Sequence, residues 1–275
     1  ETGRKTGDHQ LRRPVHQREI TTTLNSNLPA MGRTIHLILN PKAGSGKSAR
    51  AGTLLYKHFQ KMGTSIVLHS TSHAGHATAI ALSLRNSSEQ VFAVGGDGTV
   101  LEVAAGLLGG NAVLGIIPCG SGNGLARHLG IPMDPIGALI FQLERPAYLA
   151  DVMYASDRLF VNIAGIGFDG SVAAAFNTGG KRGLLNYIRL IVSGYFKSKE
   201  FTCKLSGPDF NYDGPAFIVA FANGSQYGNN ARIASGARED DGKMEVVIIR
   251  KPALWQVMRF TWQVMTGRIR NSGLV

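Results

Sequence analysis

Three glycine-rich loops, each placed directly after a short apolar segment, constrain this chain more than any other feature. The apolar segments end near residues 40, 96 and 118, and helical spacing of apolar side chains follows each loop. Short, almost continuously apolar strands that alternate with helices are typical of a parallel sheet covered on both faces. Because the carboxyl ends of such strands meet at one sheet edge, the three loops are predicted to line a single crevice.

The same pattern predicts an α/β domain followed by a β-rich domain. Strands are expected at 34–40, 65–71, 91–96 and 112–118, and helices at 47–61, 76–85, 99–108, 121–129 and 134–144. After Arg145-Pro146, strand-like segments follow one another, interrupted by helical stretches near 183–196 and 253–266. We therefore predict a nucleotide-binding domain with a parallel sheet over 34–145, and a β-rich domain that receives the acceptor over 146–275.

Residues 1–33 are polar and basic, and no hydrophobic periodicity appears before Thr34. The segment lacks the apolar stretch of a secretory signal. Its composition predicts a disordered leader or an added expression segment that takes no part in the fold. A basic arm that touches membrane or nucleic acid is the alternative interpretation.

The net charge of +11, from 29 Lys and Arg against 18 Asp and Glu, calls for an anionic partner. A phosphate ligand, an anionic membrane surface and nucleic acid all meet this requirement, but the chain lacks the signature of a nucleic-acid module, so no nucleic-acid partner is expected. Only two cysteines, Cys119 and Cys203, are present, which fits a reducing, cytoplasmic compartment. No run of 18 apolar residues exists, so we predict no membrane-spanning helix.

The first loop, residues 40–48, links a strand to a helix, the setting in which backbone N–H groups and a helix N-terminus hold phosphate. Its Gly46-Lys47-Ser48 ending looks like the end of a Walker A motif, but Pro41 stands where that motif needs Gly. The sequence therefore indicates a phosphate-binding loop that is not a standard P-loop.

The second loop, Gly95–Thr99, places three glycines around the carboxylate of Asp97 at the end of an apolar strand. A carboxylate there can hold Mg²⁺-phosphate or accept a hydroxyl proton, and the alternative is an N-cap in a tight turn. The third loop, 118–124, again lies between a strand and a helix. Three such loops at successive strand ends are far more specific than any one of them.

These residues resemble the diacylglycerol kinase catalytic-domain family. The resemblance is carried by Asn40-Pro41, by Gly95–Thr99 with Glu102, and by Gly120–Asn123 followed by Leu125-Ala126-Arg127, in order along most of the chain. The family includes sphingosine, ceramide and bacterial lipid kinases, and its nucleotide domain is similar to that of NAD kinases. It implies an α/β nucleotide domain plus a β-sandwich domain, with ATP and Mg²⁺ in the cleft and a lipid hydroxyl as acceptor.

The resemblance also implies roles for individual residues. ATP contacts are implied for Asn40, Pro41, Lys42, Gly44, Ser45, Thr71, Gly95, Gly96, Asp97, Gly98, Thr99, Glu102, Ser121 and Asn123. Thr71 opens a T-x-x-x-G-x-A segment, and Ser121 stands where the family often has Thr. The family's C-terminal Asp-Gly-Glu segment is missing, so we expect either that Asp97 is the general base or that the sequence is truncated, the second being favoured.

The same resemblance implies roles for two further parts of the chain. Arg238–Met244 is similar to an acidic Mg²⁺ segment, in which Asp241 would give its carboxylate and Arg238 and Lys243 their carbonyls, an all-oxygen set that suits Mg²⁺. The alternative is an Asp-Gly turn between strands. Asp169 would face the lipid acceptor, although a turn Asp is an equal interpretation.

Several questions stay open at this level. The helical stretch at 181–197 mixes apolar bulk with flanking bases, and a repeated Trp-Gln-Val-Met sequence places Trp255 and Trp262 on one helix face. Each stretch either contacts an anionic membrane peripherally or packs in the core. A NAD kinase-like enzyme with a soluble acceptor and a non-catalytic ATP-binding lipid sensor are the alternative functions. A second copy of the chain, in a homodimer, is a further candidate partner, and diacylglycerol, a sphingoid base, ceramide and a phospholipid are the candidate acceptors.

Overall fold

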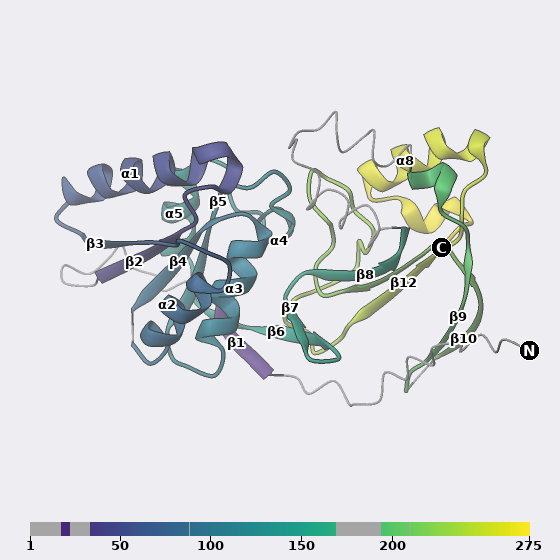
Figure 1. Ribbon diagram of the computed structural model, residues 1–275, viewed down its shortest axis with the longest axis horizontal. Coiled ribbons are helices and arrows are strands. Elements are labelled where there is room, and N and C mark those ends of the chain that lie inside the picture. The colour runs from purple at the N-terminus through teal and green to yellow at the C-terminus, as the bar shows by residue number, and fades with distance from the viewer. Residues whose placement is uncertain (1–17, 23–33, 88, 169–193, 209) are drawn as a thin grey trace, which may run out of the picture.

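The computed structural model describes residues 18–22, 34–87, 89–168, 194–208 and 210–275. Figure 1 shows two layered bodies side by side, with strands β6 and β7 at their junction. The first body is an α/β layer structure and the second consists of antiparallel sheets with a helix, as the sequence predicts. Asp169 and most of the helical stretch expected at 183–196 lie outside the described residues.

The first body is built on a seven-stranded sheet with the order β3-β2-β4-β5-β1-β6-β7. Its strands are β1 (Arg18–Thr22), β2 (Thr34–Leu39), β3 (Ser65–Ser70), β4 (Gln90–Gly95), β5 (Val113–Pro118), β6 (Tyr148–Ala155) and β7 (Arg158–Phe160). The first five strands in this order pair in parallel, whereas β6 and β7 pair antiparallel to their neighbours. The four parallel strands expected from apolar runs are thus confirmed.

Helices cover both faces of this sheet. They are α1 (Lys47–Gln60), which follows the short 3-10 helix η1 (Ala43–Gly46), then α2 (His76–Leu84), α3 (Asp97–Leu107), α4 (Gly124–His128) and α5 (Pro135–Leu143). Helix α1 lies beside α5 on one face, and α2 packs on α3 on the other (Figure 1). The fully buried Ile38, Leu55, Val94 and Leu139 join sheet and helices in one core, because strands buried on both faces need apolar cover.

The topology creates a switch point at one sheet edge. The chain leaves β2 for β3 on one side and then returns past β2 to β4 on the other, with α1 and α2 on opposite faces. Loops after β2 and β4 therefore diverge at this switch point, which is where open α/β sheets bind ligands. The two loops concerned are Asn40–Gly46 and Gly95–Asp97, the first and second glycine-rich loops.

The first sheet extends beyond the limits predicted for it, at both ends. The prediction that residues 1–33 take no part in the fold is wrong for Arg18–Thr22, because β1 pairs with β5 and, over five residues, with β6. A five-residue segment is too short to show hydrophobic periodicity. Arg18–Thr22 forms a strand because it fills the position between β5 and β6 in the sheet. Strands β6 and β7 also carry the sheet to Phe160, past the boundary predicted at residue 146.

The second body places one sheet between a helix and a hairpin. Strands β8 (Ile163–Gly167), β11 (Ile218–Ala222) and β12 (Glu245–Ile249) form a sheet in the order β12-β11-β8, and β9 (Phe201–Ser206) pairs with β10 (Asn211–Ala216). Successive residues of β11 point to opposite faces. Ala220 and Ala222 pack under helix α8 (Val257–Thr266), whereas Val219 faces the β9–β10 hairpin.

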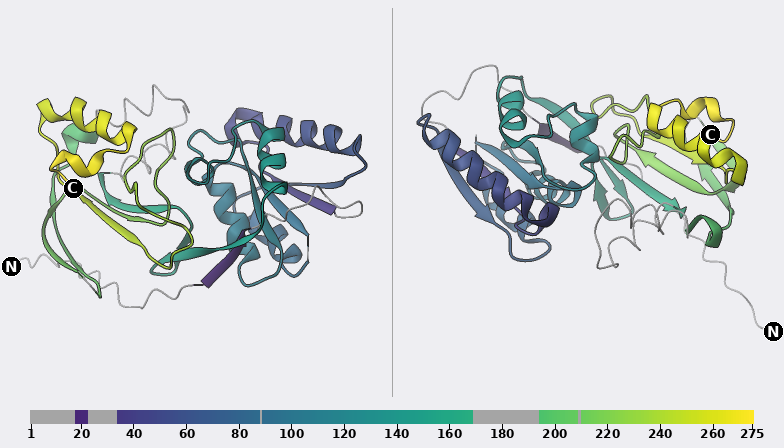
Figure 2. Two further views of the ribbon diagram at one scale, coloured as in Figure 1. Left: turned by 180° about the vertical axis from the view of Figure 1, so that it is seen from behind. Right: turned by 90° about the horizontal axis from the view of Figure 1, so that it is seen from above.

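The chain ends in a helical segment. The 3-10 helix η2 (Leu254–Gln256) leads into α8, and η3 (Ile269–Ser272) follows it. Together, η2 and α8 form the helical stretch that the sequence predicts near 253–266. Figure 2 shows this segment at the end of the second body that lies farthest from helix α1. Within the described ranges, no helix combines the length and the apolar character needed to cross a bilayer.

Candidate active site

The first glycine-rich loop is folded back by its own side chain and lies against the third loop. The Asn40 side-chain Oδ1 accepts a hydrogen bond from the Lys42 N–H at 3.0 Å, which forms a turn directly after β2. Gly44 has a φ of 57°, and a Cβ on it would overlap the carbonyl oxygen of Cys119. Glycine is therefore required at residue 44, both for the left-handed backbone and for this close approach.

Hydrogen bonds hold the three loops at the same sheet edge. The Ser48 hydroxyl donates to the carbonyl of Val94 at 2.6 Å, which fixes the start of α1 against the end of β4. The Cys119 N–H donates to the Gly95 carbonyl at 2.7 Å, so the second and third loops are joined as well. Burial raises the pKa of the Cys119 thiol to about 11, so this thiol is protonated and unsuited to nucleophilic chemistry.

The second and third loops touch through glycine backbones. A Cβ on Gly120 would lie 2.5 Å from the Gly96 Cα, and one on Gly96 would lie 3.1 Å from the Gly120 Cα. The first of these distances is too short for a side chain, so the contact requires glycine at residue 120. The glycines of both motifs therefore bring the Asp97 carboxylate next to the backbone of residues 120–124.

Asp97 is the first residue of α3, and its carboxylate points at the start of α4. The Leu125 N–H donates to its Oδ1 at 3.3 Å. Burial raises the pKa of Asp97 above its ordinary value, and backbone N–H groups of Asn123, Gly124 and Leu125 offset part of that rise. Because desolvation outweighs these hydrogen bonds, the carboxylate gains basicity, the property that a general base needs.

Within the third loop, the side chain of Asn123 is used to shape the loop. Its Nδ2 donates to the Gly120 carbonyl at 3.0 Å, and its Oδ1 accepts from the Gly120 N–H at 2.8 Å. Asn123 has a φ of 52°, a left-handed conformation that asparagine tolerates better than most residues. Ser121, by contrast, is exposed at the rim of the crevice. The ATP contacts predicted for both residues stay predictions.

Thr71 and Glu102 lie on the α2 side of the crevice. The Thr71 N–H donates to the Leu39 carbonyl at 2.9 Å, which places it beside the end of β2. The Glu102 carboxylate accepts a hydrogen bond from the Ala77 N–H at 3.2 Å, and its carbonyl accepts one from the Thr78 hydroxyl at 2.9 Å. Glu102 thus ties α3 to the first turn of α2, and the ATP contact predicted for it stays a prediction.

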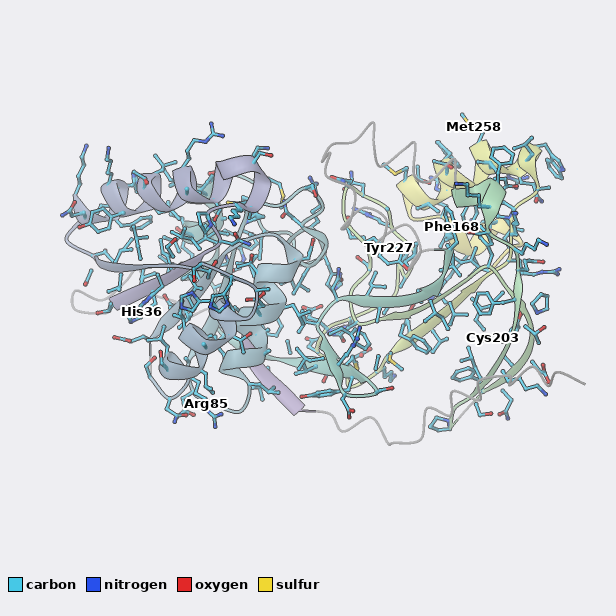
Figure 3. The ribbon with its side chains drawn as sticks, in the orientation of Figure 1. His36, Arg85, Phe168, Cys203, Tyr227 and Met258 are labelled. Carbon is cyan, nitrogen blue, oxygen red and sulfur yellow. The ribbon has the colours of Figure 1, made fainter. Side chains whose placement is uncertain are left out.

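The second body contacts the third loop. Gly228 forms a β-bridge with Asn123, and the Asn229 N–H donates to the Gly122 carbonyl at 3.4 Å. A Cβ on Gly124 would lie 2.5 Å from the carbonyl oxygen of Tyr227, so glycine at this position lets the two bodies meet. Figure 3 shows Tyr227 on the part of the second body that faces the first.

The acidic segment 238–243 folds as a turn next to β6. The Asp241 Oδ1 accepts a hydrogen bond from the Lys243 N–H at 3.0 Å, Gly242 has a φ of 71°, and its N–H donates to the Asp151 carboxylate at 2.6 Å. These contacts match the Asp-Gly turn alternative. In the part of the chain that the structure describes, no three His, Cys, Asp or Glu side chains converge as a metal site would require. The Mg²⁺ site at Arg238, Asp241 and Lys243 stays a prediction.

A hydrogen-bond network that sequence reasoning missed joins the two bodies beside the crevice. The His128 Nε2 lies 2.9 Å from the Glu239 Oε2, its Nδ1 lies 2.9 Å from the Ser225 hydroxyl, and the Tyr148 hydroxyl donates to the Glu239 Oε1 at 2.8 Å. The hydrogen bond from His128 is the main reason why the pKa of Glu239 falls to about 2. Since His128 and Glu239 are 111 residues apart, no local motif could reveal this pairing.

Three glycine-rich loops and the Asp97 carboxylate thus meet at the switch point of the first sheet, next to the second body, a setting that suits the binding of a phosphate group. Models of two protein families match this chain: the diacylglycerol kinase catalytic domain at residues 34–155, and the YegS C-terminal NAD kinase beta sandwich-like domain at residues 162–273. The first match ends with β6 and the second begins just before β8, so the short strand β7 lies between the two matched regions.

Individual relatives agree with these matches. A protein named "Probable lipid kinase YegS-like" from Chromohalobacter salexigens is 32% identical over 225 residues, covering 78% of this chain and 70% of the relative. One of the same name from Pseudomonas aeruginosa PAO1 is 31% identical over 224 residues, covering 78% and 72%. The crystal structure of a diacylglycerol kinase from Bacillus anthracis has a TM-score of 0.66 at 23% identity, covering 88% of this chain and 82% of that one, which supports the fold.

The chain belongs to the diacylglycerol kinase catalytic-domain family, and it is a lipid kinase by that membership. The family resemblance inferred from the loops is thereby confirmed, as is the two-domain fold of a parallel-sheet domain and a β-sandwich domain.

Proposed function

We propose that this protein transfers the γ-phosphoryl group of ATP to a hydroxyl of diacylglycerol, a sphingoid base or a related lipid. The observation that carries this proposal is the position of Asp97, a desolvated carboxylate that lies against the start of α4, where the second and third glycine-rich loops meet. A base placed beside bound phosphates can accept the proton of an acceptor hydroxyl, a contribution of typically 10²–10⁴-fold in rate.

The nucleotide is proposed to lie across the switch point. Backbone N–H groups of the Asn40–Gly46 and Gly95–Asp97 loops would offset phosphate charge, and the exposed Lys42 and Ser121 would add side-chain contacts at the rim. Mg²⁺, when bound, would supply charge neutralisation on the phosphates. The predicted ATP, Mg²⁺ and lipid partners rest on this arrangement together with the family membership.

A labelling experiment tests the proposal. The chain is incubated with γ-labelled ATP, Mg²⁺ and mixed micelles that contain diacylglycerol, a sphingoid base, ceramide or a phospholipid, and NAD is offered in parallel. We expect one labelled lipid, and we expect Asp97→Asn to retain less than a tenth of the rate while still binding ATP. Label on NAD alone would move the protein to a soluble acceptor. ATP binding without any labelled product would indicate a lipid sensor.

A further inference from the structure

Helix α8 and the preceding η2 expose a row of large apolar side chains on their outer face. The exposed fractions are 65% for Leu254, 78% for Trp255, 81% for Met258, 54% for Trp262 and 47% for Met265. Met258, Trp262 and Met265 recur at spacings of four and three residues and so share one helix face. We call these five residues the Trp–Met face. Large apolar side chains that are exposed side by side on a protein surface mark interaction sites.

The opposite face of α8 is fixed in the core of the second body. Phe260 and Val264 pack against the buried side chains of Val247 and Ile269, and the buried Gln263 donates from its Nε2 to the Asn271 carbonyl at 3.2 Å. This packing determines which side of the helix faces outward. Figure 3 shows Met258 at the outer end of the second body, directed away from the sheets. The Trp–Met face is therefore held rigidly toward solvent.

The charged side chains of the segment that carries the Trp–Met face are all positive. Residues 250–275 contain five bases, Arg250, Lys251, Arg259, Arg268 and Arg270, and no Asp or Glu. Arg250 and Arg270 form ion pairs with Glu200 and Glu245, whereas the Arg268 guanidinium lies 5.5 Å from the centre of the Trp262 ring. Indole rings and thioethers with flanking arginines match the boundary between lipid headgroups and acyl chains.

We propose that the Trp–Met face docks this protein on an anionic lipid bilayer, with both indoles at headgroup depth and with Arg259 and Arg268 near lipid phosphates. This inference rests on the proposed function, since a lipid acceptor resides in a bilayer. Charge complementarity favours a bilayer over a second copy of the chain, because two such faces brought together would place like charges side by side.

The chain offers a direct probe of this surface. Trp255 and Trp262 are its only two tryptophans, so intrinsic tryptophan fluorescence reports on the Trp–Met face alone. We expect vesicles of phosphatidylcholine with phosphatidylglycerol to shift this emission to the blue, and brominated lipids to quench it. Vesicles of phosphatidylcholine alone should give a smaller shift. The single substitutions Trp255→Phe and Trp262→Phe assign the signal to each indole.

Substitutions separate the docking face from apolar exposure in general. Met258→Glu should weaken vesicle partitioning about tenfold, the effect expected when a methionine side chain is no longer buried in lipid. The matched control is Met62→Glu, because Met62 is also exposed, at 58%, but lies just after α1 in the first body. This control should partition like the parent protein. Arg259→Glu should remove most of the preference for phosphatidylglycerol while far-ultraviolet circular dichroism stays unchanged.

Several outcomes would overturn the inference. An emission spectrum that ignores anionic vesicles, or equal losses for Met258→Glu and Met62→Glu, would show that the Trp–Met face does not dock. A blue shift that follows protein concentration without lipid would assign the face to a second copy of the chain. The assay contains no ATP, so docking without lipid phosphorylation would contradict the proposed function alone, and phosphorylation in micelles without docking would contradict this inference alone.

Discussion

At the scale of single residues, Asp97 is where activity and stability are expected to oppose each other. Burial raises its pKa above the ordinary 3.8, so ionisation at neutral pH costs the folded state free energy. The stability that this group contributes at low pH is lost as the pH rises through its folded pKa. Asp97→Asn keeps an oxygen acceptor for the Leu125 N–H but carries no charge. We therefore expect it to raise the free energy of unfolding at pH 7 by about 1 kcal/mol while abolishing turnover.

Thermal unfolding at several pH values checks this expectation. The gain of Asp97→Asn should shrink as the pH is lowered through the folded pKa of Asp97, because the wild-type carboxyl then becomes neutral as well. A variant that is less stable than the wild type at pH 7 would contradict the view that desolvation dominates at this residue.

Gly44 and Gly46 provide a second test at the residue scale, since both have a positive φ, of 57° and 86°. A Cβ on Gly44 would overlap the Cys119 carbonyl oxygen, whereas a Cβ on Gly46 would have nothing within 4 Å. Gly46→Ala should cost about 1 kcal/mol for the left-handed backbone. Gly44→Ala should cost a further ~1–3 kcal/mol from steric overlap, and it should weaken ATP binding. Equal losses in chemical denaturation would argue against contact between the first and third loops.

At the scale of elements, the strand β1 makes a prediction that depends on its place between β5 and β6. Without β1, the facing edges of these two strands would lack their partner. Deletion of residues 1–22 should therefore lower the free energy of unfolding by about 2 kcal/mol more than deletion of residues 1–17, an estimate from a few lost ladder hydrogen bonds. Hydrogen exchange of the β6 amides should quicken in the longer deletion only. Equal stability and equal hydrogen exchange in the two deletion variants would show that Arg18–Thr22 does not pair in the sheet.

The elements that the sequence predicts correctly are those whose signal is local. Strands β2 to β5 follow from apolar runs, helices α1 to α3 from spacing, and the three loops from glycines at strand ends. The sequence does not predict strands β1 and β10. Strand β10 (Asn211–Ala216) contains Asp213, Gly214 and Pro215, which disfavour strands. Their pairing partners, rather than their own residues, select the extended conformation.

The same distinction applies to the candidate site. That the loops with Gly95–Thr99 and Gly120–Asn123 lie together could be predicted, because each loop is recognised from a few adjacent residues after a strand. The direction of the Glu102 carboxylate, toward Ala77, and the pairing of His128 with Glu239 depend on where distant elements pack. Such contacts follow from tertiary structure and have no signature within a single segment.

At the scale of the whole molecule, the two bodies are coupled at the third glycine-rich loop. Backbone contacts join residues 122–124 to 227–229, and the His128–Glu239 pair adds side-chain hydrogen bonds a short distance along α4. The Asp151 N–H also donates to the Glu239 carbonyl at 2.6 Å, so this one residue holds both α4 and β6. Glu239 is therefore the position at which a single substitution should loosen the arrangement of the two bodies.

We expect Glu239→Gln to lower the free energy of unfolding at pH 7 by about 2 kcal/mol, the scale of a hydrogen bond to a charged group. The pKa of Glu239 is lowered from 4.5 to about 2, so its contribution is present above pH 4.5 and is lost as the pH falls toward 2. The difference between variant and wild type should vanish over that window. Glu144→Gln, at an exposed residue that ends α5, is the matched control and should change little.

Calorimetry extends this test to the coupling itself. If the His128–Glu239 pair helps the two bodies to unfold together, Glu239→Gln should broaden or divide the unfolding transition at pH 7, and ATP should then stabilise only the part that contains β2 to β5. ATP at about 100 times its dissociation constant stabilises the state that binds it by about 2.7 kcal/mol, enough to resolve the two parts. A variant that unfolds in one sharp transition, shifted as a whole by ATP, would show that the backbone contacts at 122–124 and 227–229 suffice to couple the two bodies.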